Sequence, residues 1–237
     1  MSQPKGRLYL IPTTLGDSPP LEVLPLLVKK AIEGIDHYIV EHEKSARRFI
    51  KSVVPRKSQP DLQFWEINKF TDPSELPAML QPCEAGIDMA VMSDAGCPGI
   101  ADPGAAVVRE AHQKGIQVVP LVGPSSIVLA MMASGLNGQN FAFNGYLPID
   151  KGERRKALKR LERLSADTGQ SQAFIETPYR NNQLLESMTG SLRPDTQLCV
   201  ATDLTLPTEY IRTQTIAGWK KTRVDLNKRP TLFILQA

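Results

Sequence analysis

Residues 92–104 read MSDAGCPGIADPG and connect two stretches of clear pattern. The apolar run at 87–91 before them predicts a strand, and AAVVREAHQKG at 105–115 after them predicts a helix. A connection from strand to helix usually takes about two to six residues, whereas this one takes about a dozen. The extra length indicates that the loop does more than turn the chain.

This loop is rich in glycine and proline. Glycine lets the backbone adopt positive φ and approach a ligand closely, and proline stiffens the path between such points. Because ligands of open α/β sheets bind beyond the carboxyl ends of strands, we expect a shelf for a flat ligand such as an adenosine. Asp102 and Pro103 are also predicted to begin the next helix, as its N-cap and first residue. The glycines and prolines are Gly96, Pro98, Gly99, Pro103 and Gly104.

The rest of the chain alternates short β-branched runs with amphipathic stretches, which predicts an α/β protein with a mostly parallel sheet and, late in the chain, mixed strand directions. Proline and glycine cluster near 120–124, so we expect two α/β domains, 1–121 and 122–237. Pro25 should confine or kink the helix predicted at 21–34. The expected strands are 7–11, 37–41, 63–67, 87–92, 141–146, 172–176, 197–202, 209–215 and 230–236, and the expected helices are 21–34, 44–53, 105–115, 125–134, 152–165, 179–188 and 216–221.

Composition limits the class of protein. The chain has 237 residues, 41% of them hydrophobic, and a formal net charge of +3, which permits anionic partners without requiring them. The first residues hold no apolar signal-peptide core, and no apolar run approaches the roughly 18 residues of a membrane span, so we expect a cytoplasmic protein with no membrane partner. Three widely spaced cysteines predict reduced thiols and no metal site. They are Cys83, Cys97 and Cys199.

Several motifs occur in an order that resembles the tetrapyrrole-methylase superfamily, and within it most closely the bacterial 2'-O-methyltransferases of small-subunit ribosomal RNA. The resemblance implies an S-adenosylmethionine-dependent methyltransferase with two α/β domains, a cofactor cleft between them, and a homodimer. The motifs are IPTTLGD at 11–17, SDAGCPGIADPG at 93–104, GPSS at 123–126, FIETPYR at 174–180, TDLT at 202–205 and RPTLFIL at 229–235.

The resemblance also implies which residues contact the cofactor. They fall in every motif, so both predicted domains contribute. The implied contacts are Leu15, Gly96, Cys97, Pro98, Ile100, Ser125, Ser126, Ile127, Glu176, Thr177, Pro178, Asp203, Leu204, Pro230 and Thr231.

The chain departs from this pattern on the substrate side. It reads EHEK at 41–44 where the ribosomal enzymes typically read EDTR, and ATDLTL at 201–206 where they read ARELTK. Cys97 replaces a usual threonine and exchanges a hydroxyl hydrogen bond for a weaker one. Two alternatives to an RNA methyltransferase therefore stay open: a methylase of a tetrapyrrole or another small metabolite, and a protein that binds the cofactor without catalysis.

Methyl transfer to a ribose hydroxyl benefits from a nearby base that takes the proton. The candidates are Glu41, His42, Glu43 and Glu176, of which we rank Glu41 and Glu176 first as catalytic residues. A cysteine nucleophile is not expected, because no histidine partner for Cys97 is visible in the sequence.

A basic stretch at 151–163, KGERRKALKRLER, predicts a helix whose cations fan outward while Leu158 and Leu161 face inward. We expect Arg154, Arg155 and Lys159 to bind ribosomal RNA, the predicted partner, with an ordinary solvated helix surface as the alternative. Further contacts are expected from Arg180 and, with less support, from Arg47, Arg48 and Tyr146.

Overall fold

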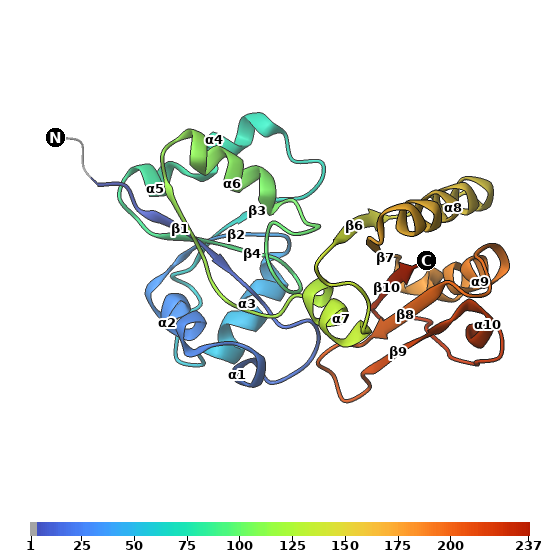
Figure 1. Ribbon diagram of the computed structural model, residues 1–237. Coiled ribbons are helices and arrows are strands. Elements are labelled where there is room, and N and C mark those ends of the chain that lie inside the picture. The colour runs from blue at the N-terminus through green and yellow to red at the C-terminus, as the bar shows by residue number, and fades with distance from the viewer. Residues whose placement is uncertain (1–3) are drawn as a thin grey trace. The chain divides into compact units, whose positions relative to one another are not determined.

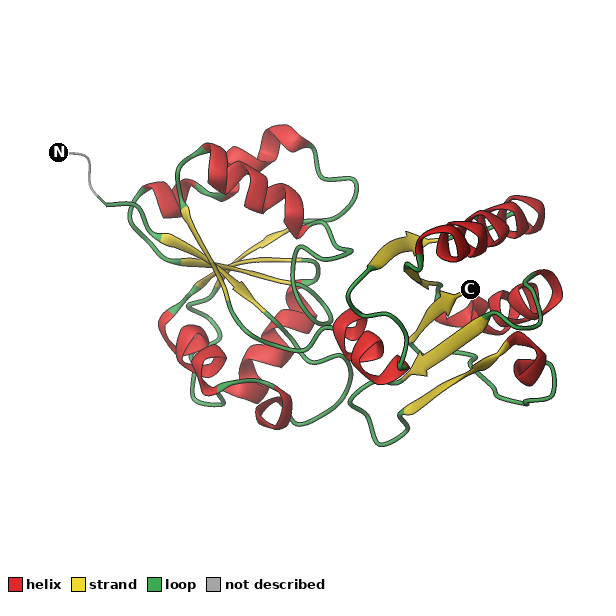
Figure 2. Cartoon of the chain, viewed as in Figure 1, coloured by secondary structure: helices red, strands yellow, loops and turns green. Residues whose placement is uncertain are grey.

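The computed structural model describes residues 4–237, which form two compact units, one ending at Ser125 and one comprising Ser126–Ala237 (Figures 1 and 2). The boundary expected after residue 121 and the one after Ser125 both fall in the segment between strand β5 and helix α7. Within the described residues, none of the helices combines the length and the apolar composition needed to cross a bilayer.

Unit 1 contains a five-stranded sheet in the order β3-β2-β4-β1-β5. Every neighbouring pair runs parallel, so all carboxyl ends lie at one edge. The strands are β1 (Arg7–Ile11), β2 (His37–Val40), β3 (Gln63–Glu66), β4 (Met89–Met92) and β5 (Gln117–Pro120).

Helices cover both faces of this sheet, as a parallel sheet requires (Figure 1). Val28 of α2 and Ile50 of α3 pack with Tyr38 in one core, whereas Met79 of α4 and Val107 of α6 pack in another. The helices are α1 (Pro20–Val23), α2 (Leu26–Gly34), α3 (Glu43–Val53), α4 (Leu76–Met79), α5 (Gln81–Glu84) and α6 (Gly104–Gln113), with the 3₁₀ helix η1 (Pro73–Glu75) before α4.

Two proline effects shape unit 1. Pro25 divides the helix predicted at 21–34 into α1 and α2, since it serves as the N-cap residue of α2 with an extended backbone. The entry to α6 corrects our expectation: Pro103, not Asp102, occupies the N-cap position and Gly104 begins the helix. Asp102 still supports this entry from one residue earlier, because its Oδ1 accepts the Gly104 N–H at 2.8 Å.

Unit 2 contains a second five-stranded sheet in the order β6-β7-β10-β8-β9. Only β6 and β7 pair in parallel, and the other pairs are antiparallel, which confirms the mixed directions predicted for this part. The elements are α7 (Ser126–Ser134), β6 (Phe141–Tyr146), α8 (Lys151–Thr168), β7 (Ser171–Ile175), η2 (Pro178–Arg180), α9 (Asn181–Ser191), β8 (Gln197–Thr202), β9 (Tyr210–Thr215), α10 (Ile216–Trp219) and β10 (Thr231–Gln236).

Helix α8 packs on the unit 2 sheet through Leu158 and Leu161, both fully buried as predicted. Arg154 contradicts the expectation that the cations of this helix all point outward. It is 6% exposed, and its guanidinium donates to Ser187 Oγ and to the Ile149 carbonyl, each at 3.1 Å. Arg154 is on the buried face because it follows the three- and four-residue spacing of Leu158 and Leu161, and its polar head joins α8 to α9.

Candidate functional site

The carboxyl edge of the unit 1 sheet has a reversal point between β1 and β4. The chain leaves β1 toward the face covered by α2 and α3, and leaves the adjacent β4 toward the face covered by α4 and α6. Loops from neighbouring strands that diverge in this way open a crevice, and this is where ligands of such sheets bind. The loop between β4 and α6 begins at this point.

Hydrogen bonds among its own residues order the β4–α6 loop. Asp102 Oδ1 accepts N–H groups from Gly99 at 2.7 Å and from Gly104, and burial raises the pKa of this carboxyl. Gly96 and Gly99 adopt φ of +77° and +82°, as predicted for glycine at these positions. The loop is therefore an ordered shelf.

Two other loops of unit 1 contact this shelf. Thr13, just after β1, donates its N–H to the Gly96 carbonyl at 3.0 Å and its hydroxyl to the Ser93 carbonyl at 3.2 Å. Cys97 Sγ lies 3.3 Å from the Pro124 carbonyl, after β5. A Cβ added to Gly96 would lie 3.0 Å from Leu15 Cδ2, so the predicted cofactor residues of these loops are in contact.

The outer part of the shelf suits an adenosine-containing cofactor. Ile100 is 54% exposed. The next residue, Ala101, has φ of +61°. An exposed apolar side chain on an ordered loop fits a nucleoside, which needs a flat apolar contact.

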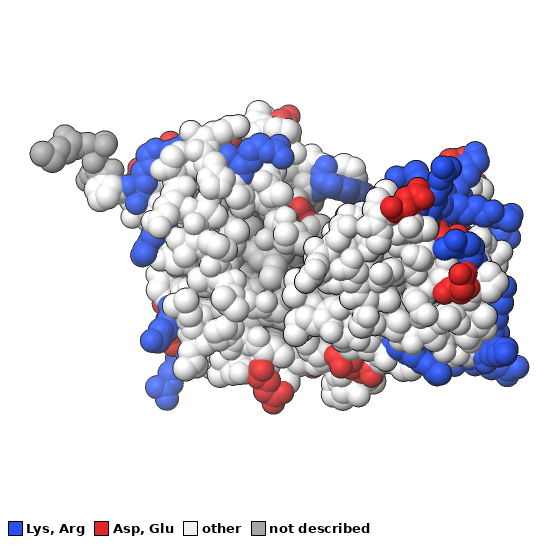
Figure 3. Space-filling model, viewed as in Figure 1, with Lys and Arg blue, Asp and Glu red and all other residues white. Residues whose placement is uncertain are grey.

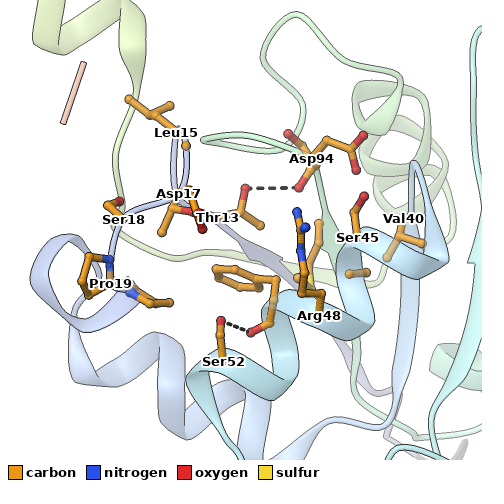
Figure 4. A pocket seen from close by; sticks show the side chains of 17 residues that line it. Thr13, Leu15, Asp17, Ser18, Pro19, Val40, Ser45, Arg48, Ser52 and Asp94 are labelled. Carbon is orange, nitrogen blue, oxygen red and sulfur yellow. Dashed lines mark hydrogen bonds between the residues drawn. The ribbon is translucent and has the colours of Figure 1, made fainter. Parts of the chain in front are cut away.

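A cavity of about 700 Å³ lies beside the shelf on the α3 side of the sheet (Figure 4). Its lining combines hydroxyls from the loop after β1 with α3 side chains, and Arg48 extends from α3 toward Thr13 and Asp94. Arg48 has no ion-pair partner among the described residues. The cavity thus has a mixed polar and apolar lining and contains one cation without an ion-pair partner among the described residues.

Acidic groups and one histidine meet where β2 and β4 end. Glu41 Oε1 accepts the Asp94 N–H at 3.0 Å, and Asp94 Oδ2 lies 2.6 Å from His42 Nδ1. Burial raises the pKa of Glu41 despite the Asp94 N–H bond, while the hydrogen bond to Asp94 raises the pKa of His42. The sequence singled out Glu41 and His42, but it missed Asp94.

The unit 2 cofactor candidates also gather at one sheet edge. Thr231 at the start of β10 lies opposite Thr202 at the end of β8, and their hydroxyl oxygens are 2.7 Å apart. Asp203 donates its N–H to the Pro230 carbonyl at 2.9 Å. Leu232 lies opposite Ile175 of β7, which brings Glu176, Thr177 and Pro178 to the same edge. Ser126 and Ile127 open α7, which packs against β10.

Glu176 is in an ion pair at this edge. Its Oε1 accepts from Arg180 Nη2 at 2.6 Å and from the Thr177 N–H at 2.7 Å. Burial opposes ionisation of Glu176, but these hydrogen bonds outweigh it, so its pKa is lowered. Glu176 Oε2 is buried with no hydrogen-bond partner among the described residues. The carboxylate is thus held charged by Arg180, which makes Arg180 a partner of Glu176 more than an open RNA contact.

The turn after β8 stores backbone strain. Asp203 and Thr205 adopt φ of +52° and +69°, which costs energy for residues with a Cβ. The Asp203 carboxylate accepts from Arg229 Nε at 2.7 Å and from the Thr208 hydroxyl at 2.9 Å, which holds the turn. Leu204, between the strained residues, is buried.

The other predicted groups are the cations of α8 and the three cysteines. Arg155 and Lys159 are exposed on α8, where lysine and arginine gather in Figure 3. Cys83, Cys97 and Cys199 are free thiols, and burial raises the pKa of Cys97, so its thiolate is disfavoured as a nucleophile. Among residues 4–237, no three His, Cys, Asp or Glu side chains form a group that could hold a metal ion.

The sequence matches a known protein family and several curated relatives. The sequence model of the family described as Tetrapyrrole (Corrin/Porphyrin) Methylases matches residues 7–218. A curated relative from Bacillus subtilis (strain 168), named ribosomal RNA small subunit methyltransferase I, is 30% identical over 217 residues, which are 90% of this chain and 70% of the relative.

Solved structures agree on the fold. The methyltransferase CobJ superposes with a TM-score of 0.65 at 16% identity, covering 98% of this chain and 94% of that one. Uroporphyrin-III C-methyltransferase from Thermus thermophilus, solved in complex with S-adenosyl homocysteine, gives a TM-score of 0.55 at 15% identity, covering 98% and 97%. These likenesses show that the chain has the fold of these methyltransferases, with two α/β units.

Proposed function

The chain belongs to the family of tetrapyrrole (corrin/porphyrin) methylases, and from this membership we propose that it methylates a ribose 2'-hydroxyl of small-subunit ribosomal RNA. It is a methyltransferase that uses S-adenosylmethionine. The observation that carries the proposal is the ordered glycine-proline shelf at the reversal point of unit 1, since it gives the family's cofactor a place at the expected edge. The printed name of the Bacillus relative supports the RNA acceptor.

We assign cofactor binding to two sets of residues, one in each unit. The shelf and the loops that contact it form the first set, and the polar edge of the unit 2 sheet forms the second. The first set is Leu15, Gly96, Cys97, Pro98, Ile100 and Ser125, and the second is Ser126, Ile127, Thr177, Pro178, Asp203, Leu204, Pro230 and Thr231.

The bound cofactor supplies an activated methyl group on a sulfonium. Because the leaving group is already good, the work of this chain is alignment and exclusion of water. The apolar surface of Ile100 would contact the nucleoside, while the hydrogen bond from Thr13 to Gly96 holds the shelf against the loop after β1.

Of the two carboxylates predicted to be catalytic, Glu41 fits the site better. Burial raises the pKa of Glu41. Its carboxylate accepts the N–H of Asp94, a residue that lines the cavity. Glu176 has a lowered pKa and an arginine partner, so it is a poor proton acceptor. We therefore place Glu41 in the acceptor site, where its carboxylate holds the Asp94 main chain, and give Glu176 a positioning role.

The RNA contact is assigned to the exposed cations of α8, Arg155 and Lys159, with Arg180 contributing from its exposed side. Arg154 is buried, and its hydrogen bonds to Ser187 and Ile149 hold α8 in place. We further propose that the protein acts in the cytoplasm as a homodimer, which light scattering of the purified chain would test. Met132 of α7, 75% exposed, is an apolar side chain suited to such a contact.

Transfer of tritiated methyl from S-adenosylmethionine tests the function directly. The acceptors are intact small ribosomal subunits, deproteinised ribosomal RNA and a panel of tetrapyrroles. Label in RNA that is resistant to alkaline cleavage at one ribose supports the proposal. Label in a tetrapyrrole would replace it with small-molecule methylation, and cofactor binding without transfer to any acceptor would leave a binding protein.

The cofactor assignment has its own test by calorimetry. Ser126→Trp places a large side chain at the start of α7, and we expect it to abolish S-adenosylmethionine binding while circular dichroism stays unchanged. Ala166→Trp, at an exposed position of α8, is the matched control and should bind normally. Equal affinity in the two variants would contradict the assignment.

A further inference from the structure

The parallel register of β2 and β4 brings a histidine and an aspartate together. Ile39 pairs with Val91 and Val40 with Met92, so continuing the register by two residues places His42 opposite Asp94. His42 Nδ1 and Asp94 Oδ2 are 2.6 Å apart, a short hydrogen bond between groups 52 positions apart in sequence. The contact is a product of the sheet topology.

This contact fixes the tautomer of the imidazole. A carboxylate only accepts hydrogen bonds, so Nδ1 of His42 must carry the proton, and in the neutral ring Nε2 then holds the free lone pair. Asp94 is itself fixed, because its N–H donates to Glu41 Oε1 at 3.0 Å. The His42 side chain is 68% exposed, which leaves Nε2 accessible to a large substrate.

The groups facing His42 from neighbouring elements are acidic. They are Asp94 after β4, Glu41 at the end of β2 and Glu66 at the end of β3, and each favours the protonated ring. On its own helix, Glu43 is paired with Arg47 at 2.7 Å, and Lys44 adds one exposed positive charge. The hydrogen bond to Asp94 and these acidic neighbours raise the pKa of His42 and so make the imidazole a stronger base.

A role in capping helix α3 does not account for the pair. His42 occupies the N-cap position of α3, but its side chain forms no capping hydrogen bond there. Asp94 also lines the cavity of about 700 Å³ that contains Arg48. His42 does not line this cavity itself, and Asp94 is the residue that links the imidazole to it.

We propose that His42 and Asp94 form a catalytic dyad in which His42 Nε2 takes the proton of the acceptor hydroxyl. The proposal rests on the proposed function. As the hydroxyl oxygen forms its bond to the methyl carbon, the carbon–sulfur bond breaks and its electron pair stays on sulfur, giving a neutral thioether. The hydroxyl proton moves to Nε2, and Asp94, a positioning residue, stabilises the imidazolium.

Single-turnover methyl transfer to the RNA acceptor, measured from about pH 5.5 to about pH 9, tests the dyad. With wild type, the rate should rise with pH and level off above the His42 pKa, and an NMR titration of His42 should give the same midpoint. His42→Gln should slow transfer about 100-fold and abolish the rise, with unchanged cofactor affinity. Asp94→Asn should shift the midpoint to lower pH and slow the plateau less.

His112→Gln, an exposed histidine in the last turn of α6, is the control and should behave as wild type. If His42→Gln binds cofactor and methylates RNA at the wild-type rate with the same pH profile, the dyad is overturned while the proposed function stands. If wild type labels only tetrapyrroles or nothing, the proposed function fails, and the dyad as a base for RNA methylation fails with it.

Discussion

Glu176 and Arg180 form an ion pair 2.6 Å long in which the carboxylate side chain is 1% exposed and the guanidinium 31% exposed. The pair joins the end of β7 to the turn that begins α9, and it lies at the same edge as the other cofactor candidates of unit 2. A buried carboxylate that relies on one cation makes that cation important for stability.

Removing the cation should therefore destabilise the protein. Arg180→Leu leaves Glu176 buried without its counter-charge, and we expect a clear loss in the free energy of unfolding, measured in urea. Arg163→Leu, which breaks an exposed pair with Asp167 at 3.6 Å, is the control, expected to cost about 0.5 kcal/mol or less. Similar losses in the two variants would show that the Glu176 pair is not a buried one in solution.

The same pair predicts an acid dependence. The pKa of Glu176 is lower in the fold than in the unfolded chain, so the unfolded state binds a proton first as pH falls. The stability from Glu176 is present above the unfolded carboxyl pKa and is lost as pH falls through the folded value. The difference in unfolding free energy between wild type and Glu176→Gln should shrink from pH 6 toward about pH 3. A difference independent of pH would contradict the lowered pKa.

Gly96 is expected to tolerate no side chain. Alanine there must adopt φ of +77° with its Cβ 3.0 Å from Leu15 Cδ2 and 3.4 Å from the Pro124 carbonyl. Gly96→Ala should cost about 1–2 kcal/mol from backbone strain alone and should weaken cofactor binding in calorimetry. Gly138→Ala meets no atom within 4 Å and should change neither quantity by a measurable amount. A stable Gly96→Ala variant with normal affinity would remove the shelf from the site.

Much of the fold was predictable because the hydrophobic periodicity and the positions of proline and glycine indicate the same elements along this chain. The strand expected at 197–202 is present, and Pro25 separates α1 from α2, as expected of a proline inside a helical stretch. Helix starts were harder to predict: the sequence favours Asp102 as the N-cap of α6, whereas Pro103 occupies that position in the structure. Arg154 was misplaced because a basic helix does not reveal which of its cations shares the buried face.

The predictability of the site residues also depends on whether sequence or strand order brings them together. Motif resemblance pointed to the residues of the shelf and of the unit 2 edge because each motif is itself a contiguous stretch of sequence. The pairing of His42 with Asp94 depends on β2 lying next to β4, a fact of strand order that a single sequence does not contain. The sequence analysis therefore ranked His42 behind Glu41 and Glu176 as a base. The cavity beside Arg48 escaped prediction for the same reason, since its lining comes from three separate strand ends.

The exposed cations of α8 make the last prediction. Each phosphate contact to RNA releases counterions, so affinity falls with salt in proportion to the number of contacts. Reversing Arg155 and Lys159 to glutamate should weaken binding to the ribosomal RNA acceptor and reduce the slope of log affinity against log salt by about 1.5. Arg154 is left intact, because its bonds to Ser187 and Ile149 support the fold.

The matched control reverses Lys30 and Lys51, two exposed lysines of unit 1, and makes the same change in net charge. We expect it to lower affinity slightly through the overall field while the salt slope stays that of wild type. The comparison separates a local contact from net charge, since only a contact changes the slope. Equal slopes in both double variants would remove α8 from the RNA-binding surface and leave RNA binding to the cavity that contains Arg48.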